Sequence, residues 1–301
     1  MSSIETASAP STVASASASV ELSTAAGTAS AASSAVSAAT GVARIARALE
    51  GGEALVPFVT CGDPDLETTE ALVRVMAEAG ADLIELGIPF SDPTAEGPVI
   101  QQANIRALSG GVTTDKILEM ARKLRSEISV PLVFMTYANV VFSYGTERFL
   151  SAAAQAGIAG LILPDVPFEE KDEFGPACRR HGLELISLIA PTSEGRVAEI
   201  AKAAEGFVYC VSSLGVTGVR SQITTDIGAM VRLVKAANPD IPCAVGFGIS
   251  TPEQAQKMAL LSDGAIVGSA IVKLVAQYGR AAVPYIRDYT SAMKAAVTSS
   301  L

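Results

Sequence analysis

The sequence predicts a closed (β/α)8 barrel, an α/β fold in which eight parallel strands form a barrel inside a ring of helices. Short apolar runs rich in Val, Ile and Leu alternate eight times with longer stretches of helical period. Alternation of this kind is typical of a parallel sheet. Each run is also nearly continuous in apolar character, as expected of a strand that is covered on both faces.

The predicted strands follow one another along the chain. They are residues 54–59, 81–87, 131–136, 158–165, 183–190, 206–212, 241–248 and 264–269. Asp65 is expected to open a helix over 66–79, and Thr251 to open one over 252–261. An open, doubly wound sheet is the structural alternative. No G-x-G-x-x-G motif opens a first helix, however, and the count of eight strands favours closure.

The first forty or so of the 301 residues are almost wholly Ala, Ser, Thr and Val, with hardly any charge. We interpret residues 1–41 as a low-complexity disordered tail and residues 42–301 as a single barrel-shaped catalytic domain. The tail lacks the basic start and compact apolar block of a secretory signal, and it lacks the Arg content of a transit peptide. A linker or transit role for the tail is the alternative.

Composition disfavours several classes of protein. A formal net charge of -9 argues against phosphate-backbone binding, so no nucleic-acid partner is expected. The longest apolar runs are too short for a membrane span. No His, Cys, Asp and Glu spacing closes a metal site. The scattered cysteines form no C-x-x-C pair, which fits a reducing cytoplasm; they are Cys61, Cys178, Cys210 and Cys243.

The chain has a single histidine, His181, which follows two arginines at a predicted helix end. A cation near a helix C-terminus has a simple structural explanation. Acid–base chemistry is therefore expected from carboxylates, Lys, Tyr or Cys.

Reactive groups of such barrels lie where the strands end, and Glu85 lies near the end of the second predicted strand. A carboxyl group that leaves an apolar strand is partly desolvated, which raises its pKa and suits it to carry a proton near neutral pH. A structural carboxylate that caps a loop is the alternative.

Two further acids follow Glu85 in a loop with three prolines. Glu96 is a candidate second acid of the same site, or a solvated acid at the start of a helix that begins near Val99. Asp92 is typical of a turn residue, although its stiff loop could also face a partner. The residues alone leave both alternatives open.

Three glycine clusters follow the sixth, seventh and eighth strands, and they indicate a phosphate site. They are Gly215-Val216-Thr217-Gly218, Gly246-Phe247-Gly248 and Gly268-Ser269-Ala270. Small residues let backbone N–H groups approach an anion, and the last cluster opens a helix, whose N-terminus favours negative charge. Tyr209, in the sixth strand, is either a core aromatic or a residue beside the substrate.

The stretch ELGIPFSDPTAEGPVIQQA (85–103) resembles the signature of the tryptophan synthase alpha subunit family. The similarity continues through LVPFVTCGDP (55–64), FMTYANVVFSYG (134–145), LILPDVPFEE (161–170), YCVSSLGVTG (209–218), VGFGISTPEQ (245–254) and IVGSAIVK (266–273). It covers essentially everything after the tail.

The resemblance implies a carbon–carbon lyase of tryptophan biosynthesis. Such an enzyme splits indole-3-glycerol phosphate into indole and glyceraldehyde 3-phosphate by retro-aldol cleavage. The resemblance also implies a beta-subunit partner in an alpha2beta2 heterotetramer. Pyridoxal phosphate would be bound in that partner, and no cofactor is expected in this chain.

The resemblance also implies residue roles. Glu85 matches the catalytic proton donor to indole C3, Tyr209 a tyrosine near the reacting centre, and Phe58 an aromatic beside the indole ring. The phosphate would be held by the backbone of Gly218, Gly248, Gly268 and Ser269. Residues expected to face the partner are Pro89, Asp92 and Asn139.

The second catalytic acid departs from the family pattern, which has Asp in A-D-G-P where this chain has Glu96 in Ala95-Glu96-Gly97-Pro98. The charge is kept, but the side chain is one methylene longer. The family also implies a lid over 213–222 that closes on bound substrate. The alternatives are another phosphosugar barrel enzyme and a catalytically weak phosphosugar-binding subunit that mainly activates its partner.

Overall fold

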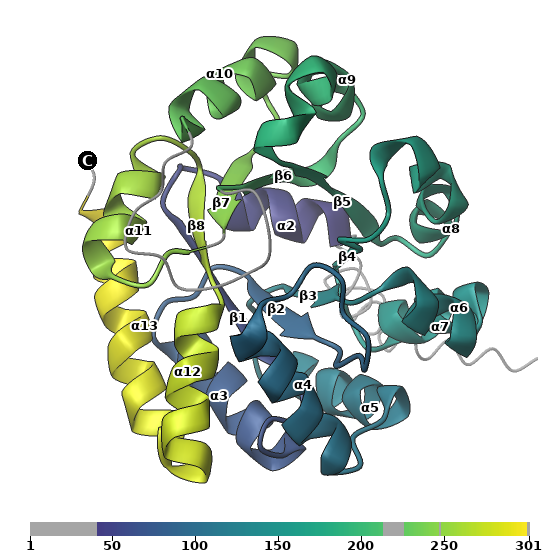
Figure 1. Ribbon diagram of the computed structural model, residues 1–301, viewed down its shortest axis with the longest axis vertical. Helices are drawn as coiled ribbons and strands as arrows, with labels where there is room; N and C mark the ends of the chain where they lie inside the picture. Colours follow the sequence, from purple (N-terminus) through teal and green to yellow (C-terminus); the bar gives the residue numbers. More distant parts are fainter. Residues whose placement is uncertain (1–40, 213–225, 247, 300–301) are drawn as a thin grey trace, which may run out of the picture. The chain divides into compact units, whose positions relative to one another are not determined.

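The computed structural model describes residues 41–212, 226–246 and 248–299, and in them eight parallel strands form a closed barrel (Figure 1). The strands are β1 (Ala54–Thr60), β2 (Ile84–Gly87), β3 (Leu132–Met135), β4 (Gly160–Ile162), β5 (Glu184–Ile189), β6 (Glu205–Val211), β7 (Cys243–Gly246) and β8 (Gly264–Val267). Each strand pairs with the next along the chain, and β8 closes the ring by pairing with β1. The predicted fold class is confirmed.

Helices surround the barrel (Figure 1). The α-helices are α2 (Gly41–Leu49), α3 (Leu66–Glu78), α4 (Pro98–Ser109), α5 (Thr114–Arg125), α6 (Ala138–Tyr144), α7 (Thr146–Gln155), α8 (Gly175–Arg180), α9 (Val197–Lys202), α10 (Ile227–Ala237), α11 (Pro252–Ala259), α12 (Ser269–Tyr278) and α13 (Val283–Thr298). Short 3-10 turns are η2 (Phe168–Glu173), η3 (Pro191–Arg196) and η4 (Gly279–Ala282).

The predicted helix starts agree with the observed caps. The Asp65 side chain accepts a hydrogen bond from the Thr68 N–H at 2.8 Å and caps α3. Thr251 and Gln254 cap the start of α11 reciprocally. Such caps satisfy backbone N–H groups that have no partner within the helix. The α3 and α11 helices therefore begin where the sequence predicts, and each ends one or two residues earlier.

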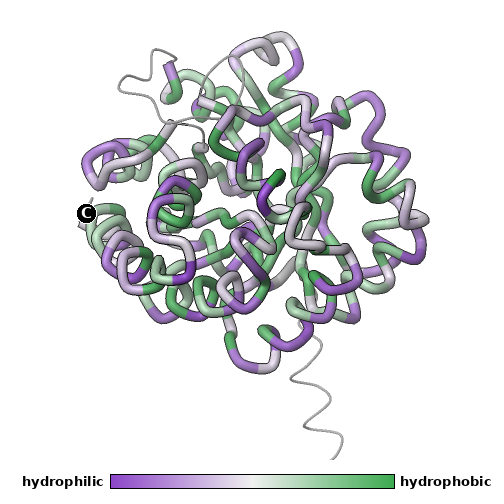
Figure 2. Tube along the Cα trace, turned by 60° about the horizontal axis from the view of Figure 1, so that its bottom comes forward, coloured by the Kyte–Doolittle hydropathy of each residue, from purple (hydrophilic) through white to green (hydrophobic). Residues whose placement is uncertain are grey.

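Apolar side chains fill both the barrel and the layer between strands and helices. Figure 2 shows hydrophobic segments gathered in the interior and hydrophilic ones along the outer helices and loops. Inside the barrel, Val56, Ile186, Phe207 and Ile266 belong to one buried cluster. Such filling makes the barrel interior a packed core rather than a pore, so a ligand has room only at its ends.

Helix α2 was not predicted from the sequence. Its buried residues Ile45 and Leu49 pack with Ala54, Leu83 and Ala159, which lie at or just before the starts of their strands. The helix thus covers the amino-terminal end of the barrel. The carboxyl ends of the strands remain for a functional site.

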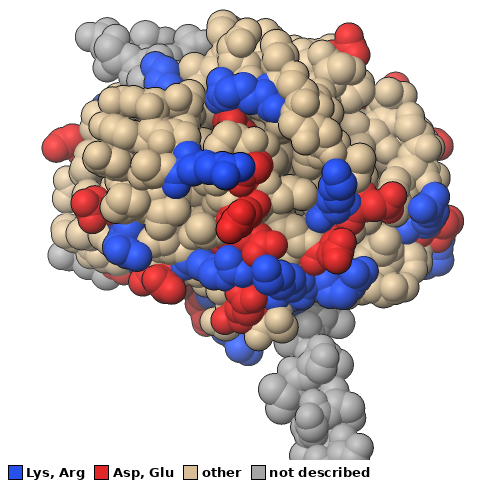
Figure 3. Space-filling view, turned by 90° about the horizontal axis from the view of Figure 1, so that it is seen from below, with Lys and Arg blue, Asp and Glu red and all other residues tan. Residues whose placement is uncertain are grey.

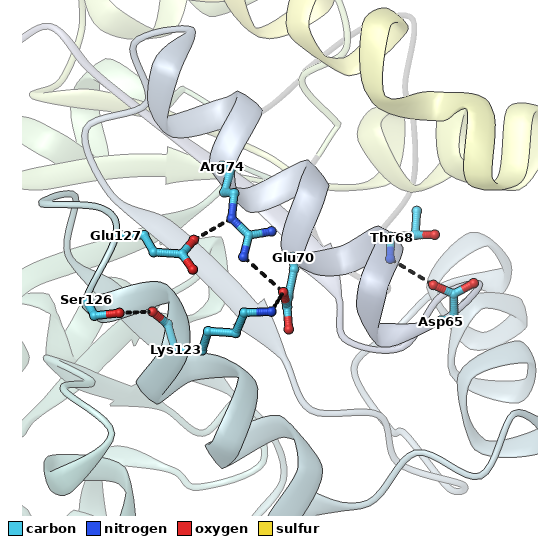
Figure 4. A network of polar contacts seen from close by, with 7 residues as sticks. All are labelled: Asp65, Thr68, Glu70, Arg74, Lys123, Ser126 and Glu127. Atoms are coloured by element: carbon cyan, nitrogen blue, oxygen red, sulfur yellow. Dashed lines mark hydrogen bonds and ion pairs between the residues drawn. The ribbon is translucent and has the colours of Figure 1, made fainter.

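Charged side chains of both signs are interspersed over the face seen in Figure 3. Glu70 of α3 accepts hydrogen bonds from Arg74 at 2.9 Å and from Lys123 of α5 at 2.6 Å (Figure 4). Arg74 also pairs with Glu127, so the network joins α3 to the segment that follows α5. Among the helices of the described residues, none combines the length and apolar character needed to cross a bilayer.

Candidate active site

A cavity at the carboxyl ends of the strands brings most of the predicted site residues together. Its apolar walls are Ile100, Met135, Ile249 and Ile266. The predicted residues that line it are Phe58, Glu85, Glu96, Tyr209, Gly248, Gly268 and Ser269. A larger cavity of about 480 Å³ lies beside β5, and none of the predicted site residues lines it.

Glu85 lies within the barrel mouth at 1% exposure. It belongs to β2, where it is in register with Phe58 of β1 and Val133 of β3. Burial raises the pKa of its carboxyl group to about 8. Among the described residues, no hydrogen-bond partner reaches its Oε1 atom. The raised pKa favours the protonated form of this side chain at neutral pH.

Glu96 lies just before Gly97, the residue that precedes α4, and its side chain is half-buried in the cavity. Burial raises the pKa of its carboxyl group, and a hydrogen bond from Asn104 partly offsets this effect; the resulting pKa is about 7. The Asn104 amide nitrogen is 2.7 Å from Oε2 of Glu96. Glu96 is thus close to a helix start, as one alternative held, yet it also lines the same cavity as Glu85.

Two aromatic rings complete the apolar part of the site. Tyr209 of β6 is 4% exposed, and burial, with a smaller contribution from Glu85, holds the pKa of its hydroxyl well above the usual value. Phe58 of β1 is 6% exposed. A Cβ atom on Gly87 would lie 2.5 Å from Cζ of Phe58, so only glycine at that position leaves room for the ring. Aromatic and aliphatic side chains therefore form the apolar walls of this cavity.

The predicted phosphate residues lie on the β7 and β8 side of the cavity. Gly248 adopts a φ of 90°, a conformation that favours glycine, and Gly268 precedes the first turn of α12 at Ser269. Backbone N–H groups at a helix N-terminus have no partner within the helix and attract anions. The part that these residues play in phosphate binding stays a prediction. Gly218 and the predicted lid at 213–222 lie outside the described residues.

The loop that carries Glu96 is tied to the start of α6. The Ala95 N–H donates to the hydroxyl oxygen of Tyr137 at 3.1 Å, and the rings of Phe90 and Tyr137 are 5.3 Å apart. Tyr137 precedes α6, whose second residue is Asn139. These two contacts join the loop to the residue that precedes α6.

The residues predicted to face a partner lie in this loop and at the start of α6, and they differ in exposure. Asp92 and Asn139 are exposed, whereas Pro89 is buried. The Asp92 carboxylate accepts a hydrogen bond from the hydroxyl group of Ser91. Contact of these residues with a partner stays a prediction.

The described residues hold no cluster of three or more His, Cys, Asp or Glu side chains that could bind a metal ion. All four cysteines are buried. His181 lies at the end of α8, where its Nε2 atom is 2.9 Å from Oε2 of Glu147. It does not line the cavity.

Comparison with known proteins agrees with the fold. Residues 45–298 match the family model of the tryptophan synthase alpha chain. The chain belongs to the tryptophan synthase alpha chain family. The alpha chain of Lacticaseibacillus casei is 45% identical over 256 residues, which make up 85% of this chain and 96% of that relative. The resemblance that the motifs predicted is thereby confirmed.

Solved structures of tryptophan synthase share the barrel. A structure from Mycobacterium tuberculosis matches with a TM-score of 0.77 at 36% identity, covering 85% of this chain and 97% of that one. The tryptophan synthase complex of Pyrococcus furiosus matches with a TM-score of 0.71 at 32% identity, covering 80% of this chain and 97% of that one. Most of the residues of this chain that the family model does not match precede residue 45.

Sequence reasoning missed several residues of this tryptophan synthase alpha-type site. Asn104 was not predicted, although it follows Ile100 by one helical turn and so shares its face of α4. Tyr137 and Met135 lie in the family motif FMTYANVVFSYG but were not predicted as site residues. An asparagine or methionine carries no chemical signal of its own, and only the helix register would have placed Asn104 near Glu96.

Proposed function

We propose that Glu85 and Glu96 are the two acid–base groups with which this chain cleaves indole-3-glycerol phosphate. As a member of the tryptophan synthase alpha chain family, the chain is a carbon–carbon lyase of tryptophan biosynthesis. Its reaction yields indole and glyceraldehyde 3-phosphate. The observation that carries the residue assignment is the pair of carboxyl groups in one apolar cavity, each with its pKa raised by burial.

The reaction needs a proton at indole C3 before the bond to the glycerol chain can break. Glu85 is protonated at neutral pH, because burial raises the pKa of its carboxyl group to about 8. It donates this proton to C3, and the ring nitrogen then carries positive charge. The Glu96 carboxylate accepts a hydrogen bond from the ring N–H and stabilises that charge.

Cleavage then returns electrons to the ring. The hydroxyl group on the glycerol carbon next to the ring loses its proton as the aldehyde C=O forms. The carbon–carbon bond breaks, its electron pair restores the aromatic indole, and the new C3–H bond remains. Glu85, now a carboxylate, accepts the hydroxyl proton and regains its starting form. One glutamate therefore serves both proton steps, and no net proton is taken up.

The remaining residues of the proposal bind substrate. Phe58 and Tyr209 contact the indole ring, since both rings line the apolar part of the cavity. The phosphate is held by backbone N–H groups at Gly248, Gly268 and Ser269, with Gly218 as the fourth contact that the family implies. No residue of this chain is assigned to a cofactor.

A beta-type subunit is the proposed partner, in an alpha2beta2 assembly in which the partner binds pyridoxal phosphate. Related structures include a tryptophan synthase complex. Asp92, in the loop before α4, and Asn139, at the start of α6, are both exposed. We place the assembly in the cytoplasm and keep residues 1–41 as a tail before the barrel domain of 42–301.

The test is indole release from indole-3-glycerol phosphate by the native chain and by Glu85→Gln, each with and without a beta-type subunit. The native chain should be slow alone and faster with the partner. The variant should lose at least about a hundredfold in both settings, a usual effect of removing a general acid. Glu78→Gln, at an exposed position on α3, is the matched control. Undiminished cleavage by Glu85→Gln would remove Glu85 from the mechanism.

A further inference from the structure

Helix α4 holds Glu96 at two points. The Gln101 amide nitrogen donates to the backbone carbonyl oxygen of Glu96 at 2.7 Å. The Asn104 amide nitrogen donates to Oε2 of the Glu96 carboxylate, also at 2.7 Å. Asn104 is 4% exposed, whereas Gln101 is exposed. The hydrogen bond from Asn104 to the Glu96 carboxylate is therefore sheltered from water, unlike the one from Gln101.

An ion pair ties the helix that carries Asn104 to the loop after β1. Arg106, two residues further on, makes two parallel hydrogen bonds to Asp63 at 2.8 and 2.7 Å. Asp63 is 3% exposed and follows β1. A two-point bond between a guanidinium and a buried carboxylate fixes orientation as well as distance. Helix α4 thus presents the Asn104 amide from an anchored position.

The surroundings of Glu96 make this donor important. The titratable groups that face it are Tyr137, which precedes α6, Glu85 of β2 and Tyr209 of β6. None of the described residues lining the cavity is basic. An ionised carboxylate only accepts hydrogen bonds, so the nitrogen of the Asn104 amide must be the atom that faces it. Donation to the charged form lowers the pKa of Glu96 and opposes the effect of burial.

We propose that Asn104 is a positioning residue of the lyase, whose amide directs the Glu96 carboxylate toward the indole N–H and favours its anionic form. This inference rests on the function proposed above for Glu96. Asn104 does not touch the reacting atoms; it acts through Glu96. Its removal should therefore impair the reaction mainly at pH values where Glu96 becomes protonated.

Two substitutions separate this role from simple packing. Asn104→Asp keeps the shape of the side chain but replaces the donor with a second acid beside Glu96. Asn104→Ala removes the donor and leaves space. If Asn104 only fills volume, the isosteric Asp variant is the milder one. If Asn104 donates to the carboxylate, the Asp variant is the more severe, because repulsion is added to the lost bond.

The decisive measurement does not depend on turnover. Side-chain carboxyl carbons of glutamate, labelled with carbon-13, are titrated by NMR, and the Glu96 signal is assigned by its loss in Glu96→Gln. We expect a midpoint near pH 7 in the native chain. It should rise by about one pH unit in Asn104→Ala and further in Asn104→Asp. Gln102→Ala, at an exposed position on the same helix, should leave it unchanged.

Kinetics supplies the second readout. The acidic limb of the kcat/KM profile for indole release should move to higher pH in the same order. It then approaches the alkaline limb at which Glu85 loses its proton, so the pH optimum narrows and its maximum falls. When Glu96 is already replaced by Gln, the additional substitution Asn104→Asp should change kcat/KM little. An unmoved Glu96 midpoint in both Asn104 variants overturns the inference, even if the native chain is an active lyase. A shifted midpoint in a chain that does not release indole would retain the Asn104–Glu96 link and reject the proposed role of Glu96.

Discussion

Gly246 of β7 lies against the ring of Tyr209 of β6, so closely that no larger residue fits. A Cβ atom at position 246 would be 2.4 Å from the Tyr209 hydroxyl oxygen and 2.6 Å from Cε1. Contacts of that length do not occur between non-bonded atoms in a packed interior. The glycine thus determines where the tyrosine lies in the barrel mouth.

Gly246→Ala is therefore expected to move Tyr209 and lower indole release. Because Tyr209 is proposed to contact the substrate, a displacement of about 1 Å should cost roughly ten- to a hundredfold in kcat/KM. Overpacking should also lower the free energy of unfolding by about 1–3 kcal/mol. Steady-state kinetics and urea unfolding test the two effects.

Gly195→Ala is the matched control, because this exposed glycine of η3 has no atom within 4 Å of the added methyl group. It should change neither quantity. Full activity in Gly246→Ala, with Tyr209 still displaced by spectroscopic or structural criteria, would show that Tyr209 has no role beside the substrate.

Arg106→Ala should destabilise the fold through Asp63. The substitution leaves an aspartate that is 3% exposed without its guanidinium partner. Loss of one partner of a fully buried pair costs about 3–5 kcal/mol. Arg106 is about one-third exposed, so we expect a smaller loss of about 2 kcal/mol in the free energy of unfolding. Urea denaturation measures it.

Arg106→Lys should recover only part of that loss, because an ammonium group cannot reproduce the two-point bond. The comparison variant is Arg196→Ala, whose pair with Glu169 at 2.6 Å is exposed on both sides and should contribute less than about 1 kcal/mol. Equal losses in Arg106→Ala and Arg196→Ala would contradict the special role given to the buried aspartate.

Local patterns predicted the strands well, since most strand positions are buried and apolar. The same physics made some predicted strands too long. Residues 158–165 were expected to form the fourth strand, yet β4 spans only Gly160–Ile162. Leu163 is buried but has no strand pairing. In a sequence, an apolar residue that is only buried looks the same as one that also belongs to a strand.

Glu85 was predicted as a site residue because it is an acid near the end of an apolar strand. Glu96 was predicted because it follows in the next loop and lies at the position of an acid in the family motif. What the sequence could not give are contacts between distant segments. Arg106 and Asp63 are 43 residues apart and neither is unusual in its local context. Helix α2 was missed because its few apolar residues follow a long Ala- and Ser-rich stretch. The helix is stabilised by packing of Ile45 and Leu49 against the amino-terminal end of the barrel, a contact between distant segments.

Stability should fall as the pH rises, because of the same buried acid that the mechanism uses. Burial raises the pKa of Glu85 from an ordinary value of 4.5 to about 8 in the folded chain. Between these values the unfolded chain releases a proton that the folded chain keeps. The free energy of unfolding therefore decreases across this window, by at most about 1.4 kcal/mol per pH unit for one proton, and levels off above it. Glu96, with a folded pKa of about 7, contributes with the same sign over a narrower window.

Glu85→Gln removes the larger contribution, since glutamine stays neutral in both states. Measured by urea unfolding at intervals from about pH 5 to about pH 9, the variant should gain stability relative to the native chain up to about pH 8 and then keep a constant difference. Glu78→Gln, at an exposed position, should follow the native profile. Parallel profiles for Glu85→Gln and the native chain would mean that Glu85 is ionised in the folded protein at neutral pH, and it could then not deliver the proton that cleavage requires.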